Sequence, residues 1–157
     1  MRPAQTPLGL HLSRVSKLVS RAFDDALAEA GGSLPVWLVL VNLKAHPQAS
    51  QRELAEAIGL TEATLTHHLN AMDGDGLVTR RRDPTNRRVH VLAMTKEGES
   101  AFARLRAAAL DFDRRLRRGI SSEESRQLTD VLDRLRRNAE DTGGGDERWS
   151  DVIERRP

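Results

Sequence analysis

The chain has 157 residues, of which 38% are hydrophobic and 31% charged, and its formal net charge at pH 7 is +2. This length accommodates one domain with a modest core and not two full domains. The small net charge excludes a protein that coats nucleic acid through overall positive charge, so any basic surface must be local. The absence of cysteine excludes disulfides, thiolate metal sites and cysteine-based peroxide sensing. Neither a signal peptide nor a membrane-spanning apolar run is evident, so we expect a cytoplasmic chain without a membrane partner.

The first two predicted elements are helices. Apolar side chains recur at helical spacing over residues 8–30, until a pair of glycines ends the pattern. Residues 33–46 are apolar enough for a buried strand, but Pro35 suits a first helical turn and Pro47 suits a terminator. The pattern therefore favours a second, buried helix.

Two short helices with a very short connection are predicted over residues 50–74. Ser50 and Glu53 form a capping box at the start of the first helix, which should end at Gly59. Thr61 is the N-cap of the second, whose apolar residues repeat at i, i+4 and i+7. This arrangement is typical of a helix-turn-helix, in which the first helix braces against the DNA backbone and the second lies in the major groove.

The exposed face of the second short helix is predicted to read bases. It carries small hydroxyls, an imidazole and an amide, each of which can donate or accept a hydrogen bond at a base edge. The predicted DNA contacts of the two helices are Ser50, Gln51, Arg52, Thr61, Thr64, Thr66, His67 and Asn70.

An antiparallel hairpin should follow, because the apolar pattern changes to period 2 in residues 77–80 and again in 89–94. Its connection, residues 81–88, is rich in arginine and contains Asp-Pro and Asn turn signals. By composition alone this connection is equally a solvated loop. Behind a helix-turn-helix it becomes a wing whose guanidinium groups can enter the minor groove. The predicted wing contacts are Arg81, Arg82, Arg87 and Arg88.

The remainder of the chain is predicted to form two helices and a tail. The first runs from Thr95 towards Gly119, and the second opens with a capping box at Ser121 and Glu124. The expected fold is therefore mainly α with a small β-hairpin wing, a winged helix-turn-helix with four helices before the wing and two after it. The expected organisation is an N-terminal dimerisation helix (1–32), a DNA-binding lobe (33–95), C-terminal dimerisation helices (96–140) and a flexible tail (141–157).

Residues 8–138 resemble the multiple-antibiotic-resistance regulator (MarR) family of winged-helix transcription factors. The resemblance is strongest in Asp83-Pro84-x-Asn86-Arg87-Arg88 and Met94-Thr95-x-x-Gly98, where members commonly show Asp-Pro-x-Asp-Arg-Arg and Leu-Thr-x-x-Gly. Met94 conserves the volume of leucine, whereas Asn86 forfeits a salt bridge that would orient a wing arginine. The resemblance implies that Arg88 enters the minor groove and that Arg87 supports it or contacts phosphate. It also implies a homodimer, paired through its terminal helices, on an imperfectly palindromic operator of double-stranded DNA.

A small-molecule effector is a further implication of the resemblance, since relatives bind such ligands, often aromatic acids, between the dimerisation helices and the winged-helix lobe. The candidate residues supply a donor, a cation and aromatic walls, and they are His11, Arg14, Trp37 and Phe102. Each also has a plainer interpretation: Trp37 as core, Phe102 as core or dimer seam, and Arg14 as a surface charge.

Three other functional classes account for less of the sequence. A zinc-responsive regulator of the same fold gains no support from spacing, because His67 and His68 point apart on a helix and the other histidines are scattered. A non-specific architectural DNA-binding protein would share the wing and would differ in its sequence dependence. An enzyme would need a nucleophile with its base or a phosphate loop, and neither is found. We expect a transcriptional regulator, more often a repressor, without a cofactor or resident metal, and the first two alternatives stay open.

Overall fold

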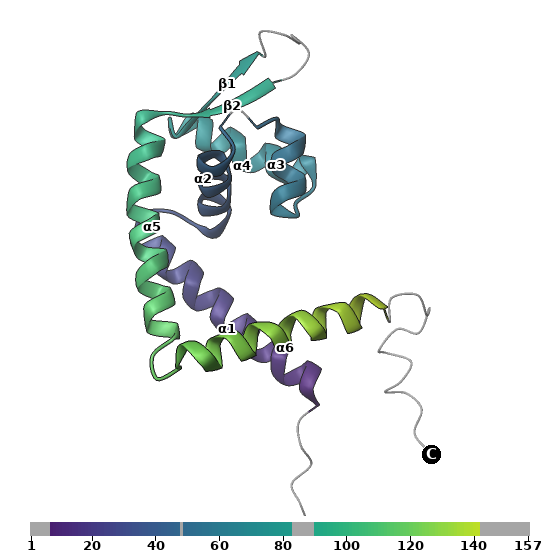
Figure 1. The fold of residues 1–157 in the computed structure, drawn as a ribbon. Helices are drawn as coiled ribbons and strands as arrows, with labels where there is room; N and C mark the ends of the chain where they lie inside the picture. Colours follow the sequence, from purple (N-terminus) through teal and green to yellow (C-terminus); the bar gives the residue numbers. More distant parts are fainter. Residues whose placement is uncertain (1–6, 48, 83–89, 142–157) are drawn as a thin grey trace, which may run out of the picture. The chain divides into compact units, whose positions relative to one another are not determined.

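The computed structural model describes residues 7–47, 49–82 and 90–141. Six helices and a two-stranded antiparallel hairpin confirm the predicted fold class (Figure 1). The elements are α1 (Leu8–Glu29), α2 (Leu34–Ala45), α3 (Gln51–Ile58), α4 (Glu62–Gly74), β1 (Val78–Arg82), β2 (His90–Met94), α5 (Lys96–Leu116) and α6 (Ser122–Asp141). The chain divides into two compact units, Met1–Arg114 and Arg115–Pro157. The Gly-rich tail predicted beyond Asp141 lies outside the described residues.

The predicted helix boundaries agree closely with the structure where a capping residue defines them. Ser50 and Thr61 are extended residues whose hydroxyls accept hydrogen bonds from the third backbone N–H of α3 and α4. Gly59 ends α3 in the left-handed region, at φ +76°, which glycine adopts without steric penalty. Residues 34–45 are helical and not extended, with Pro35 in the first turn, as the proline positions predict.

The strand ends of the hairpin differ from the prediction, because β1 runs two residues further and β2 begins one residue later. Its ladder pairs Val78 with Met94 at one end and Arg82 with His90 at the other, so the backbone at positions 81 and 82 belongs to β1 and not to the connection. Charged residues are tolerated in this strand because a two-stranded sheet has a solvated face. Ser50 forms an isolated bridge with Val91, and Leu92 N–H donates to the Ala49 carbonyl at 3.3 Å. The start of α3 is thereby fixed to the hairpin, a pairing that the sequence did not predict.

One apolar core lies within the first unit and supports the helix-turn-helix. Leu65, Leu69 and Met72 of α4 are fully buried, which confirms its predicted inner face. The core also takes side chains from α1, α2, α3, both strands and α5, namely Leu27, Val39, Leu40, Leu43, Leu54, Ala55, Val78, Leu92, Ala101 and Leu105. No single described helix is both long and apolar enough to span a bilayer, and only α1 with α2, joined at a bend of 78°, reach that length and composition together.

The junction between the hairpin and α5 is tightly built around Thr95 and Gly98. The Thr95 hydroxyl donates to the carbonyl oxygens of Gly76 (2.5 Å) and Leu77 (3.2 Å), and accepts from Gly98 N–H at 3.0 Å. The Thr95 N–H also donates to the Leu77 carbonyl at 3.1 Å. A Cβ at position 98 would lie only 2.1 Å from that same oxygen. The Met94-Thr95-x-x-Gly98 motif therefore has a structural reason: threonine joins the start of β1 to α5, and glycine permits the close approach.

The described part of the second unit comprises the last two residues of α5, the turn after them and α6. Ser121 and Glu124 form the predicted capping box, with Ser121 N–H donating to the carboxylate at 2.8 Å and Glu124 N–H donating to the hydroxyl at 3.2 Å. The hydrogen bonds from Ser121 lower the pKa of the Glu124 carboxyl.

Candidate nucleic-acid interface

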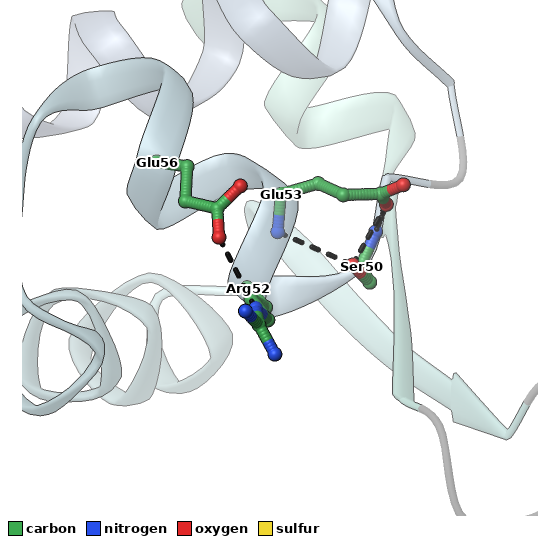
Figure 2. A network of polar contacts seen from close by, with 4 residues as sticks. All are labelled: Ser50, Arg52, Glu53 and Glu56. Carbon is green, nitrogen blue, oxygen red and sulfur yellow. Dashed lines mark hydrogen bonds and ion pairs between the residues drawn. The ribbon is translucent and has the colours of Figure 1, made fainter.

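The N-terminus of α3 is held by a capping box that engages one of the predicted DNA contacts (Figure 2). Ser50 N–H and its hydroxyl both donate to the Glu53 carboxylate, at 2.8 and 2.7 Å, and the hydroxyl accepts from Glu53 N–H at 3.2 Å. These bonds lower the pKa of the Glu53 carboxyl, which stays exposed. The Ser50 side chain is thus committed to the cap.

Arg52 lies in the first turn of the same helix, and its side chain is 77% exposed. Its Nε donates to the Glu56 carboxylate at 3.1 Å, and this hydrogen bond, with the charge of Glu56, raises the pKa of Arg52 (Figure 2). An exposed i, i+4 pair of this kind contributes little to stability. Arg52 can therefore exchange its carboxylate for a phosphate without disturbing the fold.

Gln51 and Thr66 connect the two helices of the motif. The Gln51 amide Nε2 donates to the Thr66 hydroxyl, and that hydroxyl donates to the Glu62 carbonyl at 2.7 Å. Thr66 is half-buried. Both polar groups already have partners within the protein, so the structure gives these two predicted DNA contacts a role in fixing α3 against α4.

The remaining predicted contacts of α4 lie on its exposed side. The Thr61 and Thr64 hydroxyls are 2.9 Å apart at its N-terminus, where four backbone N–H groups begin without helical partners. His67 and Asn70 are exposed in the middle of the helix, whereas His68 is half-buried and meets the His67 ring edge-on at 5.7 Å between centroids. The helix therefore presents hydroxyls, an imidazole and an amide to solvent along one face.

A contact between α4 and the hairpin was not anticipated from the sequence. Arg80 of β1 donates from Nη2 to the Asn70 Oδ1 at 2.7 Å, and its Nε is buried with no hydrogen-bond partner in the described part of the chain. From the sequence, position 80 is only the end of the first predicted strand, and Arg80 is given no contact of its own. The contact depends on the packing of α4 against β1 and joins two residues that are ten positions apart in sequence.

The arginines of the wing are described only in part. Arg81 is exposed on β1, and the backbone of Arg82 is paired with His90. The predicted minor-groove residue Arg88 and its neighbour Arg87 lie outside the described residues.

Two of the predicted effector residues are brought together by the fold. The Trp37 and Phe102 rings stack at 5.8 Å with an interplanar angle of 11°, and both are half-buried. Lys44 Nζ lies 5.7 Å from the Phe102 centroid and pairs with the Glu99 carboxylate at 2.6 Å. A cation and an anion thus accompany the aromatic pair, and neither had been singled out in the sequence.

The other two predicted effector residues, His11 and Arg14, are exposed on α1, and neither side chain forms an ion pair or hydrogen bond with any described residue. A pocket of about 320 Å³ adjoins Lys44 and Glu99 and is lined also by Leu43, Pro47, Leu92, Ala93 and Met94. None of the predicted effector residues lines this pocket. Over residues 7–47, 49–82 and 90–141, no group of three or more imidazole or carboxylate side chains is arranged to hold a metal ion.

Comparisons with known proteins agree with this arrangement. A family model described as "MarR family" matches residues 33–90, the segment that runs from α2 to the wing. The transcriptional repressor CouR bound to a 23-mer DNA duplex is similar to this chain, with 28% identity, 82% of this chain and 91% of that chain covered, and a TM-score of 0.75.

Two further solved structures extend the likeness beyond the matched segment. CouR from Rhodococcus jostii RHA1 bound to p-coumaroyl-CoA is 27% identical, over 86% of this chain and 95% of the other, with a TM-score of 0.72. A MarR-family transcriptional regulator from Rhodococcus sp. RHA1 is also 27% identical, over 86% and 96% of the two chains, with a TM-score of 0.72. The similarity therefore includes the terminal helices as well as the helix-turn-helix and hairpin.

Proposed function

The chain belongs to the MarR family of transcriptional regulators, and on that premise we propose that it is a cytoplasmic repressor that binds a palindromic operator as a homodimer. The observation that carries the proposal is the exposed polar face of α4, fixed beside an arginine-bearing hairpin by side-chain contacts from α3 and β1. A rigid helix with a polar outer face suits the major groove, and an adjacent basic hairpin suits the minor groove.

The proposed contacts divide into two kinds. Thr64, His67 and Asn70 read base edges, because they are exposed on α4 and can donate or accept hydrogen bonds. The remaining predicted residues contact phosphate, enter the minor groove or hold α4 in place. They are Ser50, Gln51, Arg52, Thr61, Thr66, Arg81, Arg82, Arg87 and Arg88.

Homodimer formation is proposed from the apolar faces of the terminal helices. On α1, Leu8, Leu12, Val15 and Leu18 recur at helical spacing and are exposed by 37–69%. On α6, Leu128, Val131 and Leu132 are exposed by 39–52%. Apolar faces of this kind are typical of an interface between chains. In this scheme, residues 1–32 and 96–140 form the dimerisation region and residues 33–95 form the DNA-binding lobe.

We propose that an aromatic acid or its thioester releases the repressor from DNA. CouR is a repressor in this family that has been captured both with DNA and with p-coumaroyl-CoA. In this chain the stacked Trp37 and Phe102 offer an aromatic wall. His11 as a hydrogen-bond donor and Arg14 as a cation, whose side chains have no partner among the described residues, offer contacts for an anion. The ligand releases DNA only if it prefers a conformation that fits the operator poorly, so ligand and DNA affinities must be reciprocally coupled.

The operator test is selection of bound fragments from the source genome, followed by titration of the selected sequence and of random DNA at one salt concentration. We expect a palindrome preferred over random DNA by a factor on the order of 10³ or more. Equal affinity for both would refute a sequence-specific regulator and favour an architectural DNA-binding protein. Sedimentation at micromolar concentration should show a dimer, and a monomer would contradict the proposed assembly.

The effector test is calorimetry with a panel of hydroxybenzoates, hydroxycinnamates, their coenzyme A thioesters and zinc. Binding of an aromatic acid or thioester should be weakened by Arg14→Ala and should lower operator affinity in the parent protein. The matched control is Arg21→Ala, which removes a second exposed cation from the same helix. Undiminished binding to Arg14→Ala would remove that anchor, and a response to zinc alone would favour a metal sensor.

A further inference from the structure

Within the described residues of α4 and the hairpin, a side-chain hydrogen bond between Asn70 and Arg80 joins the two elements. Asn70 is exposed on α4, and its Oδ1 accepts from Arg80 Nη2 at 2.7 Å. Arg80 is half-buried, and its Nε is out of contact with solvent. The guanidinium is therefore held by the packing of the hairpin against α4 and is not a freely moving surface group.

This contact fixes which end of the Asn70 amide faces the arginine. A guanidinium has five donors and no acceptor, so only the oxygen of a carboxamide can lie against it. The Nδ2 group of Asn70 has no hydrogen-bond partner among the described residues. The amide consequently has its two N–H donors available to a ligand, while its oxygen is engaged by Arg80.

A free asparagine recognises adenine with both ends of the amide, because Oδ1 accepts from N6 and Nδ2 donates to N7. An amide whose oxygen is engaged by a neighbouring arginine is instead a donor at the base edge. Guanine presents two acceptors in the major groove, N7 and O6, whereas cytosine presents the N4 donor. The same side chain thus favours guanine and disfavours cytosine when Arg80 holds it.

From this geometry, and resting on the proposed DNA-binding function, we infer that Arg80 is a positioning residue that makes Asn70 a donor-only reader, selective for guanine at one base pair of each half-site. Arg80 acts through Asn70 and not by contacting the base. Removal of the Arg80 guanidinium frees the Asn70 amide to rotate, so that either its oxygen or its nitrogen can face the DNA. Substitution of Arg80 should therefore alter the preference at one position, which loss of a phosphate contact does not do.

The decisive experiment changes the hydrogen-bonding groups of residue 70 and leaves Arg80 in place. Asn70→Asp retains an acceptor for Arg80 but offers the DNA an oxygen acceptor, so the preferred base at that position should change from guanine to one with a donor, cytosine or adenine. Asn70→Ala should flatten the preference at the same position, by roughly 10-fold, whereas Arg80→Leu, which frees the amide, should shift it from guanine towards adenine. The matched control is Arg81→Leu, the exposed neighbour on β1, which should weaken all sequences alike without altering any preference.

The readout is binding of each variant to a library of the selected operator randomised at every half-site position, with thermal unfolding recorded to establish that each variant is folded. If Asn70→Asp retains the base preference of the parent protein, or if Asn70→Ala changes no position, the inference is overturned. If Arg80→Leu fails to fold, the Asn70→Asp result alone decides. A parent protein that selects no operator would instead refute the proposed function, so the two failures are distinguishable.

Discussion

Gly98→Ala tests the junction that joins the DNA-reading hairpin to α5. The added methyl carbon would lie 2.1 Å from the Leu77 carbonyl oxygen and 2.7 Å from Met94 Cγ. The side chain of Met94 can adjust, but the oxygen belongs to the backbone and already accepts two hydrogen bonds from Thr95, at 3.1 and 3.2 Å. The substitution must therefore displace α5 from the start of β1 or break those bonds.

The magnitude follows from three contributions. Overpacking against a well-packed site costs about 1–3 kcal/mol. Weakening two hydrogen bonds adds about 1 kcal/mol for each bond lost. Alanine recovers up to about 1 kcal/mol through its higher helix propensity. We expect a net destabilisation of about 2–3 kcal/mol, which corresponds to a fall in melting temperature of roughly 5–10 °C for a protein of this size.

The assay is thermal unfolding followed by circular dichroism, with Gly74→Ala as the matched control. Gly74 ends α4, and an added Cβ there meets nothing within 4 Å. The same chemical change should therefore leave stability unchanged or raise it by up to about 1 kcal/mol. If Gly98→Ala has the same melting temperature as the parent protein, the close approach to the Leu77 carbonyl does not constrain the junction. The structural explanation of the Met94-Thr95-x-x-Gly98 motif then fails.

Two further predictions concern the wing and the helix caps. Arg88→Ala should weaken operator binding by about 1–3 kcal/mol while leaving the melting temperature unchanged, and unaltered affinity at fixed salt would contradict the wing assignment. Hydrogen bonds from Ser50 lower the pKa of the Glu53 carboxyl in the folded protein. The stability that these bonds add is therefore fully present above the pKa of Glu53 in the unfolded chain, about 4.3, and is lost as the pH falls through its pKa in the folded protein. Ser50→Ala should therefore destabilise the protein at pH 7, and urea titrations should show the difference from the parent shrinking at pH 3; a difference independent of pH would contradict this linkage.

Most helix and strand boundaries could be predicted from the sequence, because they depend on residues only a few positions apart in the chain. A capping box such as Ser50 with Glu53 acts over three residues, and both predicted boxes are found at their helix starts. Proline and glycine likewise mark ends through their own backbone preferences, which is why α2 could be distinguished from a strand. The end of β1 was predicted two residues too early, since consecutive arginines in a solvated strand give no apolar alternation to follow.

The contacts that organise the candidate site were much harder to predict. The pairing of Lys44 with Glu99 joins residues 55 positions apart, and the bridge of Ser50 to Val91 depends on how the hairpin folds back. Neither leaves a periodic signal. The role of Gln51 and Thr66 was also hidden, because a polar residue on an exposed helix face looks the same whether it serves DNA or the neighbouring helix. Tertiary packing decides between those uses.

The distribution of ion pairs explains how a chain of net charge +2 could bind a polyanion. On α5 and α6, several arginines pair with acids one turn away, as Arg114 does with Asp111 and Arg136 with Glu140, so those charges are compensated locally. Arg81 on β1 has no ion pair with any described residue. Each phosphate contact lowers the logarithm of the binding constant by about 0.9 per tenfold rise in salt. Arg81→Gln should therefore reduce the salt slope by about that amount, for each chain that contacts DNA, while Arg136→Gln leaves it unchanged. Equal slopes for both variants would show that overall charge, and not the exposed arginine of the hairpin, attracts the DNA.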